Sequence, residues 1–346
     1  MEELFRDLVY DWIGLSPRRI WKALRLRSAY ESALQRRAGV FERTGVPVPP
    51  LVMISVTTNC NLSCGYCYAA TQTAAGDMPR EMFEDLICQA KKLGSFFFLL
   101  TGGEPLLYPS LLDILERHPD SVFFAFSNAT VLTSGIARRI ARMGNLILLL
   151  GMDGDRDETD GNRGQGVYDS LQRGAGLLRG DGALFGFSVT VTSRNFRQLA
   201  EPEFLLQRCQ DGHRVGFFIE YLPLGRQPDA SLCLTPDQRV LFRDRFLKQR
   251  GQQRMFLVQF PDDELEAGGC LAAGRGLIHI NAGGYVEPCP AVQSAVDNIG
   301  EKSLLECLAS PFLKGLRDRA EARGGTQPSP GSPACSMLEK EKPTVG

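Results

Sequence analysis

The sequence lacks the features of a membrane-spanning or secreted protein. Its strongly apolar runs, such as Phe96–Leu100 and Leu146–Leu150, are much shorter than the roughly 18 residues that a spanning helix needs. The first residues, MEELFRDLVYDW, place acidic side chains where a secretion signal has basic ones. Positive charge is not in excess, because 39 Lys and Arg face 40 Asp and Glu, a net charge of −1. We therefore expect a cytoplasmic protein that binds no nucleic acid through bulk positive charge.

Histidine is scarce, with three residues, whereas cysteine is abundant, with ten. Because a reducing cytoplasm does not keep structural disulfides, clustered cysteines predict metal ligands. Two groups have this character: Cys60, Cys64 and Cys67, which are close in sequence, and Cys270, Cys289 and Cys335, which lie in Gly/Pro-rich segments. The remaining four are predicted to be small buried apolar residues: Cys88, Cys209, Cys233 and Cys307.

We divide the chain into an N-terminal helical extension (1–50), a core (51–250) and a C-terminal part (251–346). The extension has an apolar face at helical spacing, formed by Leu4, Phe5, Leu8, Val9, Trp12 and Ile13. Residues 17–37 then carry seven basic side chains against one acidic. Such a helix can lie peripherally on an anionic membrane, or it can pack against the protein with a solvated basic face. The prolines at 47, 49 and 50 are expected to end the segment.

Apolar runs of strand length alternate with helical patterns in residues 51–225. The expected strands are 51–57, 96–100, 122–127, 146–151, 185–191 and 216–221. The expected helices are 79–93, 109–117, 132–142, 167–179 and 199–209. The alternation predicts parallel strands, in an open doubly wound sheet or a partial barrel. In both arrangements the chemistry belongs at the carboxyl ends of the strands.

The rest of the chain has a different sequence pattern. A helix is expected over 235–250, with Thr235 as its N-cap. Residues 277–280 and 285–286 flank a Gly-Gly turn and predict a β-hairpin. A helical stretch over 303–320 precedes a tail rich in Gly, Pro and Ser, which we expect to be irregular.

The strongest chemical signal is CNLSCGYC, in which Cys60, Cys64 and Cys67 directly follow the first expected strand. Three thiolates on a short loop can bind one corner of an iron–sulfur cube and leave its fourth iron open. A zinc site usually needs four ligands in pairs and fits this spacing less well. Inert cysteines are the remaining alternative.

With Tyr66 just before its last cysteine, this motif resembles the signature of the radical S-adenosylmethionine (SAM) superfamily. The resemblance implies a partial (βα)6 TIM-type barrel in which Cys60, Cys64 and Cys67 hold a [4Fe-4S] cluster that binds SAM. Tyr66 would lie beside the adenine. The resemblance implies further SAM contacts at the ends of later strands: Gly102, Gly103 and Glu104 in a GGEP motif, Ser127, Asn128, Asp153, Arg163 and Ser188. Gly151 stands where the family usually has Ser.

A second resemblance concerns the C-terminal part. The spacing of Cys270, Gly284 and Cys289 is similar to the start of a SPASM or twitch extension, and the hairpin would return the second cysteine close to the first. The resemblance implies a small α+β domain of truncated, one-cluster type. Its auxiliary [4Fe-4S] cluster would be held by Cys270, Cys289 and Cys335, with the fourth position open or filled by Cys307 or another group.

The family resemblance also implies a reaction. SAM would be reductively cleaved to methionine and a 5′-deoxyadenosyl radical, which abstracts hydrogen from a peptide, sugar or lipid substrate. The auxiliary cluster would accept an electron or bind that substrate. An external one-electron donor of flavodoxin or ferredoxin type is expected, and Asp153, Glu220 and Tyr221 are candidate bases. The alternative is a non-catalytic iron–sulfur carrier or scaffold, which would have no use for the GGEP motif.

Overall fold

The computed structural model describes residues 16–71, 76–252, 254–266 and 268–322. Its strands are β1 (Leu51–Thr57), β2 (Phe97–Gly102), β3 (Val122–Ser127), β4 (Leu146–Met152), β5 (Phe185–Val191), β6 (Val215–Glu220), β7 (Phe256–Phe260), β8 (Leu277–Ile280) and β9 (Val286–Glu287). These strands form one sheet in the order β7-β6-β5-β4-β3-β2-β1-β8-β9. All neighbours are parallel except β8 and β9, which form the predicted hairpin.

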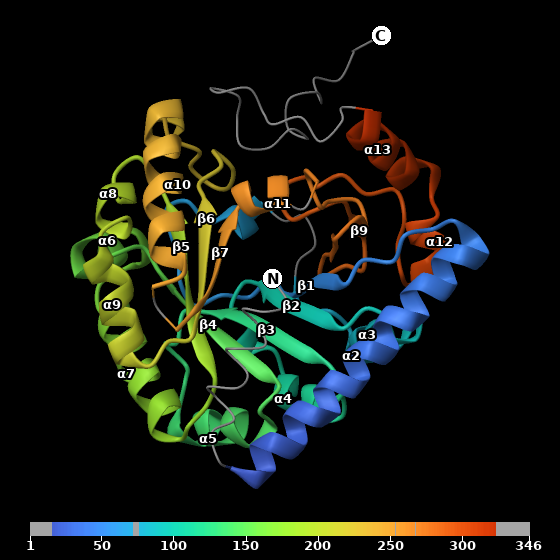
Figure 1. The fold of residues 1–346 in the computed structure, drawn as a ribbon, viewed down its shortest axis with the longest axis horizontal. Helices are drawn as coiled ribbons and strands as arrows, with labels where there is room; N and C mark the ends of the chain where they lie inside the picture. The colour runs from blue at the N-terminus through green and yellow to red at the C-terminus, as the bar shows by residue number, and fades with distance from the viewer. Residues whose placement is uncertain (1–15, 72–75, 253, 267, 323–346) are drawn as a thin grey trace.

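Helices connect the strands and cover the sheet (Figure 1). The longer ones are α2 (Pro17–Thr44), α3 (Arg80–Leu93), α5 (Ser134–Met143), α7 (Val167–Gly180), α9 (Pro202–Asp211), α10 (Pro236–Arg250) and α13 (Pro311–Ala322). The shorter ones are α4 (Leu111–Glu116), α6 (Arg156–Arg163), α8 (Phe196–Leu199), α11 (Asp262–Glu266) and α12 (Leu304–Leu308), with 3-10 turns η1 (Tyr68–Thr71), η2 (Pro105–Leu107) and η3 (Ala230–Leu232). Consecutive parallel strands joined by helices in sequential order are the pattern of a partial TIM-type barrel rather than of a doubly wound sheet. The predicted fold class is confirmed.

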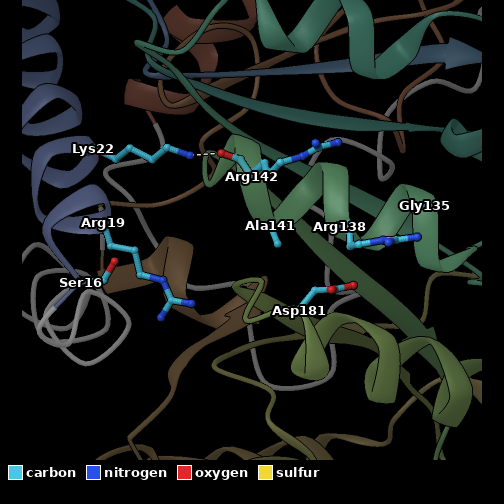
Figure 2. Close-up of a pocket in the computed structure, with 8 residues that line it drawn as sticks. All are labelled: Ser16, Arg19, Lys22, Gly135, Arg138, Ala141, Arg142 and Asp181. Atoms are coloured by element: carbon cyan, nitrogen blue, oxygen red, sulfur yellow. Dashed lines mark hydrogen bonds between the residues drawn. The ribbon is translucent and has the colours of Figure 1, made fainter.

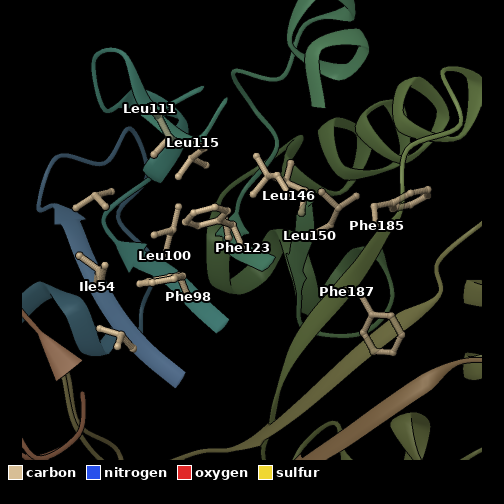
Figure 3. Packing of buried hydrophobic residues seen from close by; sticks show 14 of the residues in the cluster. Ile54, Phe98, Leu100, Leu111, Leu115, Phe123, Leu146, Leu150, Phe185 and Phe187 are labelled. Carbon is tan, nitrogen blue, oxygen red and sulfur yellow. The ribbon is translucent and has the colours of Figure 1, made fainter. Parts of the chain in front are cut away.

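The two faces of the sheet are both buried, as continuous apolar strands require. One face packs against the connecting helices, and Figure 3 shows Ile54, Phe98 and Phe123 there with Leu111 and Leu115 of α4. The rings of Phe98 and Phe123 stack with centroids 5.2 Å apart. The alternate residues of the same strands form a second apolar cluster on the other face: Met53, Leu99, Phe124, Leu149, Phe217 and Val258.

Helix α2 covers the amino ends of the strands. Ala33 is fully buried, and Tyr30 packs edge-on against Phe96, which lies just before β2, with ring centroids 5.3 Å apart. Arg19 donates to the carbonyl of Gly182, just before β5, at 2.9 Å. The sequence pattern at 4–13 lies outside the described residues.

Some boundaries differ from the sequence expectations. Helix α2 ends at Thr44, before the prolines, and the predicted helix over 303–320 is two helices, α12 and α13, separated at Ser310. The predicted helix over 199–209 is likewise divided into α8 and α9, because Pro202 starts a new helix at its first position.

Helix α6, strand β7 and the short helix α11 were not predicted. Helix α6 has the polar sequence RDETDGNR, which has no apolar periodicity. Its one local signal is Asp155, whose side chain caps the helix by accepting from the Glu158 N–H at 3.1 Å. Strand β7 has no counterpart among the expected strands, yet it extends the sheet beyond β6. Consequently the segment after residue 250 contributes strands at both edges of the sheet, since β8 pairs with β1.

Candidate active site

Cys60, Cys64 and Cys67 lie on the loop that leaves the carboxyl end of β1. All three are free thiols, and they are close enough for their charges to influence one another. Burial raises the pKa of the Cys60 thiol, and it raises that of Cys64 to about 11. Thiols in this environment ionise when a positively charged partner, such as iron, compensates the loss of water.

The donor set fits a cluster better than a single ion. Within the described ranges, no three Cys, His, Asp or Glu side chains converge tightly enough to hold one metal ion. A [4Fe-4S] cube needs no such convergence, because each thiolate binds a different iron at a corner of the cube. Three thiols on one loop are therefore a suitable donor set for a cube with one open iron.

Two neighbouring loops support the cysteine loop. The N–H of Gly103, after β2, donates to the carbonyl of Thr57 at 2.7 Å, and the N–H of Glu104 donates to that of Asn59 at 2.9 Å. From α6, the side-chain oxygen of Asn162 accepts from the N–H of Gly65 at 3.1 Å. The backbone just before Cys60 is thus attached to the loop after β2, and the backbone just after Cys64 is attached to α6.

The glycine pair lies directly against the start of the cysteine loop. A Cβ on Gly102 would lie 2.0 Å from the carbonyl oxygen of Thr57, and one on Gly103 would lie 2.1 Å from that of Asn59. Both distances are far below van der Waals contact. The glycines are therefore required for the approach of this loop to the cysteine loop, and their expected approach to SAM stays a prediction.

Glu104 is buried and joins the end of β2 to the end of β3. Its carboxylate accepts from the Ser127 hydroxyl at 2.9 Å, the Asn128 N–H at 2.7 Å and the Leu106 N–H at 3.1 Å. Burial raises the pKa of Glu104, while these hydrogen bonds oppose the increase. The Asn128 amide donates to Asn61 at 3.0 Å, so this side chain faces the cysteine loop.

After β4, the buried Asp153 forms an ion pair with the partly buried Arg163. The Arg163 Nε donates to Asp153 at 2.6 Å, and Asn162 donates to the same carboxylate oxygen at 2.9 Å. Gly151 explains how the guanidinium fits, because a Cβ there would lie 2.7 Å from Arg163 Nη1. A serine at this position would compete with Arg163 for that space.

Tyr66 and Ser188 complete the predicted set. Burial raises the pKa of the Tyr66 hydroxyl, and the neighbouring charge of Asp153 raises it further. Ser188 pairs in register with Gly151 on the adjacent strand, so it lies on the same part of the sheet. Tyr66, Gly102, Gly103, Glu104, Ser127, Asn128, Asp153 and Arg163 all gather around the carboxyl ends of β1 to β4, although their contacts with SAM stay a prediction.

Comparisons with known proteins agree with this geometry. A family model described as "Radical SAM superfamily" matches residues 54–183. The mycofactocin maturase MftC of Mycobacterium tuberculosis is 30% identical over 277 residues, which cover 75% of this chain and 68% of MftC. The chain belongs to the radical SAM superfamily.

Two further proteins resemble this chain over a larger share of its length. An AdoMet-dependent heme synthase of Methanosarcina barkeri is 26% identical over 331 residues, covering 86% of this chain and 90% of the synthase. The crystal structure of Streptococcus suis SuiB bound to S-adenosylmethionine shares the fold, with a TM-score of 0.68 at 18% identity, covering 82% of this chain and 71% of SuiB. This radical SAM protein is therefore an enzyme rather than a non-catalytic carrier, and SAM and a [4Fe-4S] cluster are its family cofactors.

The three candidate bases of this radical SAM enzyme already have hydrogen-bond or ion-pair partners within the fold. The Glu220 carboxylate accepts from Arg239 Nε at 2.9 Å, and Asp153 is paired with Arg163. A carboxylate held by a guanidinium is a weak proton acceptor. The Tyr221 hydroxyl accepts from the Asp229 N–H at 3.0 Å, and its ring lies edge-on to Tyr66 with centroids 5.5 Å apart.

The C-terminal cysteines are only partly described. The N–H of Ala273 donates to the carbonyl of Pro288 at 2.9 Å, so the segments that carry Cys270 and Cys289 lie against each other. Cys335 lies outside the described residues. Cys307 is fully buried in the apolar core beside Leu304 and Leu308, as its helical sequence pattern predicted.

A buried polar chain near these cysteines was not predicted. The Ser55 Oγ lies 2.8 Å from His279 Nε2, and His279 Nδ1 lies 2.7 Å from Glu287. Asn281 donates to the other Glu287 oxygen at 2.9 Å. The chain joins β1, which carries the cysteine loop, to β9, which leads into Cys289. The only sequence signal was His279 itself, a polar residue within an apolar strand.

A cavity of about 500 Å³ lies elsewhere, between α2 and α5 (Figure 2). Arg142 and Asp181, which line it, immediately precede β4 and β5 respectively. The cavity therefore opens at the amino ends of the strands, opposite the radical SAM site.

Proposed function

We propose that this radical SAM enzyme oxidises a C–H bond of an organic substrate, with Cys60, Cys64 and Cys67 holding the cluster. When bound, the cluster and SAM would supply a 5′-deoxyadenosyl radical by reductive cleavage of SAM. The observation that supports this assignment is the attachment of the three-thiol loop to Glu104 and Asn162 at the carboxyl ends of the strands. An external one-electron donor of flavodoxin or ferredoxin type would supply the electron.

The chain's own residues would shape the SAM site. Tyr66 would contact the adenine, and the remaining acceptor capacity of Glu104 would bind the SAM ammonium group. Arg163 binds Asp153 through Nε and Nη2, and its Nη1 lies above Gly151. We expect Nη1 to donate a hydrogen bond to a carboxylate group of the bound ligand. Ser127 and Asn128 would act mainly by holding Glu104 and the cysteine loop, and Ser188 would contact SAM or substrate from β5.

We further propose an auxiliary [4Fe-4S] cluster at Cys270, Cys289 and Cys335, within a C-terminal unit that spans 251–346. The hydrogen bond between Ala273 and Pro288 supports it, because it brings two of the three cysteine segments together. The cluster would accept an electron from the substrate or bind it. The domain division at 50 and 250 is part of the same proposal.

The first test is cluster-dependent SAM cleavage by the full chain under strong reductant. Cys64→Ala should abolish 5′-deoxyadenosine formation. Cys88→Ala, on α3 and remote from the loop, is the matched control and should leave it unchanged. Cleavage at the normal rate in Cys64→Ala would refute the site assignment.

The second test concerns the auxiliary cluster. Two cubes would contain about eight irons per chain, so Cys270→Ala/Cys289→Ala should retain roughly half the iron. That variant should still cleave SAM without substrate, whereas product formation should be lost. Full iron content in the variant would contradict the auxiliary site and leave the first cluster standing.

The third test addresses the substrate. One relative is named a heme synthase, and a solved structure of the same fold, SuiB, is bound to a precursor peptide, so tetrapyrroles and peptides are the first panels to try. Deuterium transferred from a labelled candidate into 5′-deoxyadenosine identifies the substrate. Sugars and lipids form the next panel, and transfer from none of the four classes would oppose C–H oxidation as the reaction.

A further inference from the structure

The outer face of α2 is unusual for its exposed apolar side chains. Of the eleven large apolar side chains exposed in the described part of the chain, five lie on this one helix: Ile20, Trp21, Leu24, Leu34 and Phe41. Trp21 and Leu24 are each 61% exposed and Ile20 is 40% exposed. We call Ile20, Trp21 and Leu24 the α2 patch.

The α2 patch faces away from the protein. At 3.6 residues per turn, Ile20, Trp21 and Leu24 occupy one sector of the helix. The residues that pack onto the sheet, including Tyr30 and Ala33, occupy the opposite sector. The helix therefore has two apolar sides, and within the described residues only one of them packs against the protein.

Positive charge surrounds the patch. Helix α2 carries eight basic and two acidic residues, a net charge of +6 in a chain whose net charge is −1. The exposed Arg25 guanidinium lies 5.6 Å from the centre of the Trp21 ring. At the same end of the helix, Arg138 and Arg142 of α5 line the cavity of Figure 2 together with Arg19, Lys22 and the acidic Asp181.

The position of the patch restricts its occupant. It lies at the amino ends of the strands, opposite the cysteine loop, so a protein that delivers electrons to the cluster has no reason to dock there. A second copy of the chain would bring two helices of net charge +6 together, which is repulsive. A flat anionic surface satisfies both the cations and the exposed Trp and Leu.

We propose that the α2 patch binds an anionic membrane surface. Helix α2 would lie in the plane of the interface, with Trp21, Leu24 and Ile20 among the headgroups and Arg25 beside lipid phosphates. The helix is about 42 Å long, at 1.5 Å per residue, and its whole length would run along the membrane surface. The radical SAM site would then open away from the lipid. This inference is independent of the reaction proposed above.

The test is co-sedimentation of the full chain with vesicles of phosphatidylcholine, with and without phosphatidylglycerol, at low and high salt. We expect binding to the anionic vesicles only, weakened by salt. Trp21→Ala/Leu24→Ala should weaken it on the order of tenfold or more, since two buried apolar side chains are lost. Val240→Ala/Leu247→Ala, an exposed apolar pair on α10, is the matched control and should bind like the wild type.

Fluorescence provides a second, direct measurement. The chain has two tryptophans, Trp12 and Trp21, so Trp12→Phe leaves Trp21 as the only reporter. Its emission should shift to the blue with anionic vesicles and stay unchanged with inorganic phosphate, which distinguishes a lipid surface from free phosphate. Absence of vesicle binding at low salt, or equal loss in the α10 control, would overturn the proposal. Self-association abolished by Trp21→Ala/Leu24→Ala without vesicle binding would overturn it in favour of a dimer.

Discussion

Gly103 constrains the cysteine loop through one backbone contact. Its absent Cβ leaves room for the carbonyl of Asn59, whereas an added Cβ would lie 2.1 Å from that oxygen. Because both partners are backbone, the overlap can be relieved only by moving the loop that carries Cys60. At the residue scale, we therefore expect a side chain at position 103 to disturb the cysteine loop, and through it the binding of a cluster.

We therefore predict that Gly103→Ala lowers cluster occupancy on reconstitution, several-fold relative to wild type, as measured by bound iron and visible absorbance. Gly135→Ala is the control, since a Cβ there meets nothing closer than 3.7 Å and the site is on α5. Normal iron content with reduced SAM affinity in Gly103→Ala would instead support direct contact with the ligand.

At the scale of elements, the β8–β9 hairpin is attached to β1 by Ser55, His279 and Glu287. All three side chains are buried, and Glu287 depends on His279 and Asn281 for its hydrogen bonds. Removing the Ser55 hydroxyl deletes its hydrogen bond to His279, whereas removing His279 leaves a buried carboxylate short of a partner.

We predict a graded loss of folding free energy. Ser55→Ala should cost about 1 kcal/mol and His279→Leu about 3–5 kcal/mol, measured by denaturant unfolding of the full chain. If the hairpin also positions Cys289, His279→Leu should lower auxiliary-cluster iron more than Ser55→Ala does. Equal and small losses in both variants would show that Glu287 does not rely on the imidazole.

A second element-scale prediction concerns His213, between α9 and β6. Burial lowers the pKa of its imidazole to about 3, and the positive charge of Arg208 adds to this effect. Since the folded pKa lies below the unfolded value of about 6.5, the unfolded state takes up a proton first as the pH falls. Folding stability is therefore lost progressively from about pH 6.5 toward pH 3.

The contribution of His213 between pH 7 and pH 5 is about 2 kcal/mol. A phenylalanine should fit this site, because the rings of Phe185 and Phe187 already pack against His213. Since phenylalanine does not titrate, we expect His213→Phe to lose about 2 kcal/mol less folding stability than the wild type between pH 7 and pH 5. Parallel pH profiles of urea unfolding for the two proteins would contradict the assignment.

For the whole molecule, the cysteine loop contributes little to the two apolar layers of the sheet: among its described residues only Leu62 packs against them, and that side chain is partly buried. Residues such as Ile54, Phe98 and Phe123 pack without it. Binding of a cluster should therefore stabilise the loop and the native state by mass action without creating the fold.

We predict that iron removal by a chelator leaves the far-UV circular dichroism spectrum unchanged and lowers Tm. Proteolysis should increase within residues 58–71 before it does so in the helices. Loss of helical signal on iron removal would show that the core itself depends on the cluster.

Much of this arrangement follows from the sequence alone. Apolar runs at strand spacing reflect burial of each strand on both faces, so β1 to β6 and most connecting helices were predicted within a few residues. Because parallel strands present their carboxyl ends at one edge, the order of motifs was sufficient to bring Cys60, Glu104, Asn128 and Asp153 together.

Only the tertiary structure decided the long-range pairings. Periodicity reports how a segment is buried but not which partner it is buried against, so β8 beside β1 and the contact of Ser55 with His279 have no local signature. Helix α6 is polar throughout, yet it places Arg163 above Gly151 and Asn162 against Gly65. The sequence determined which chemistry is present at this site; packing between distant segments determined which residues support it.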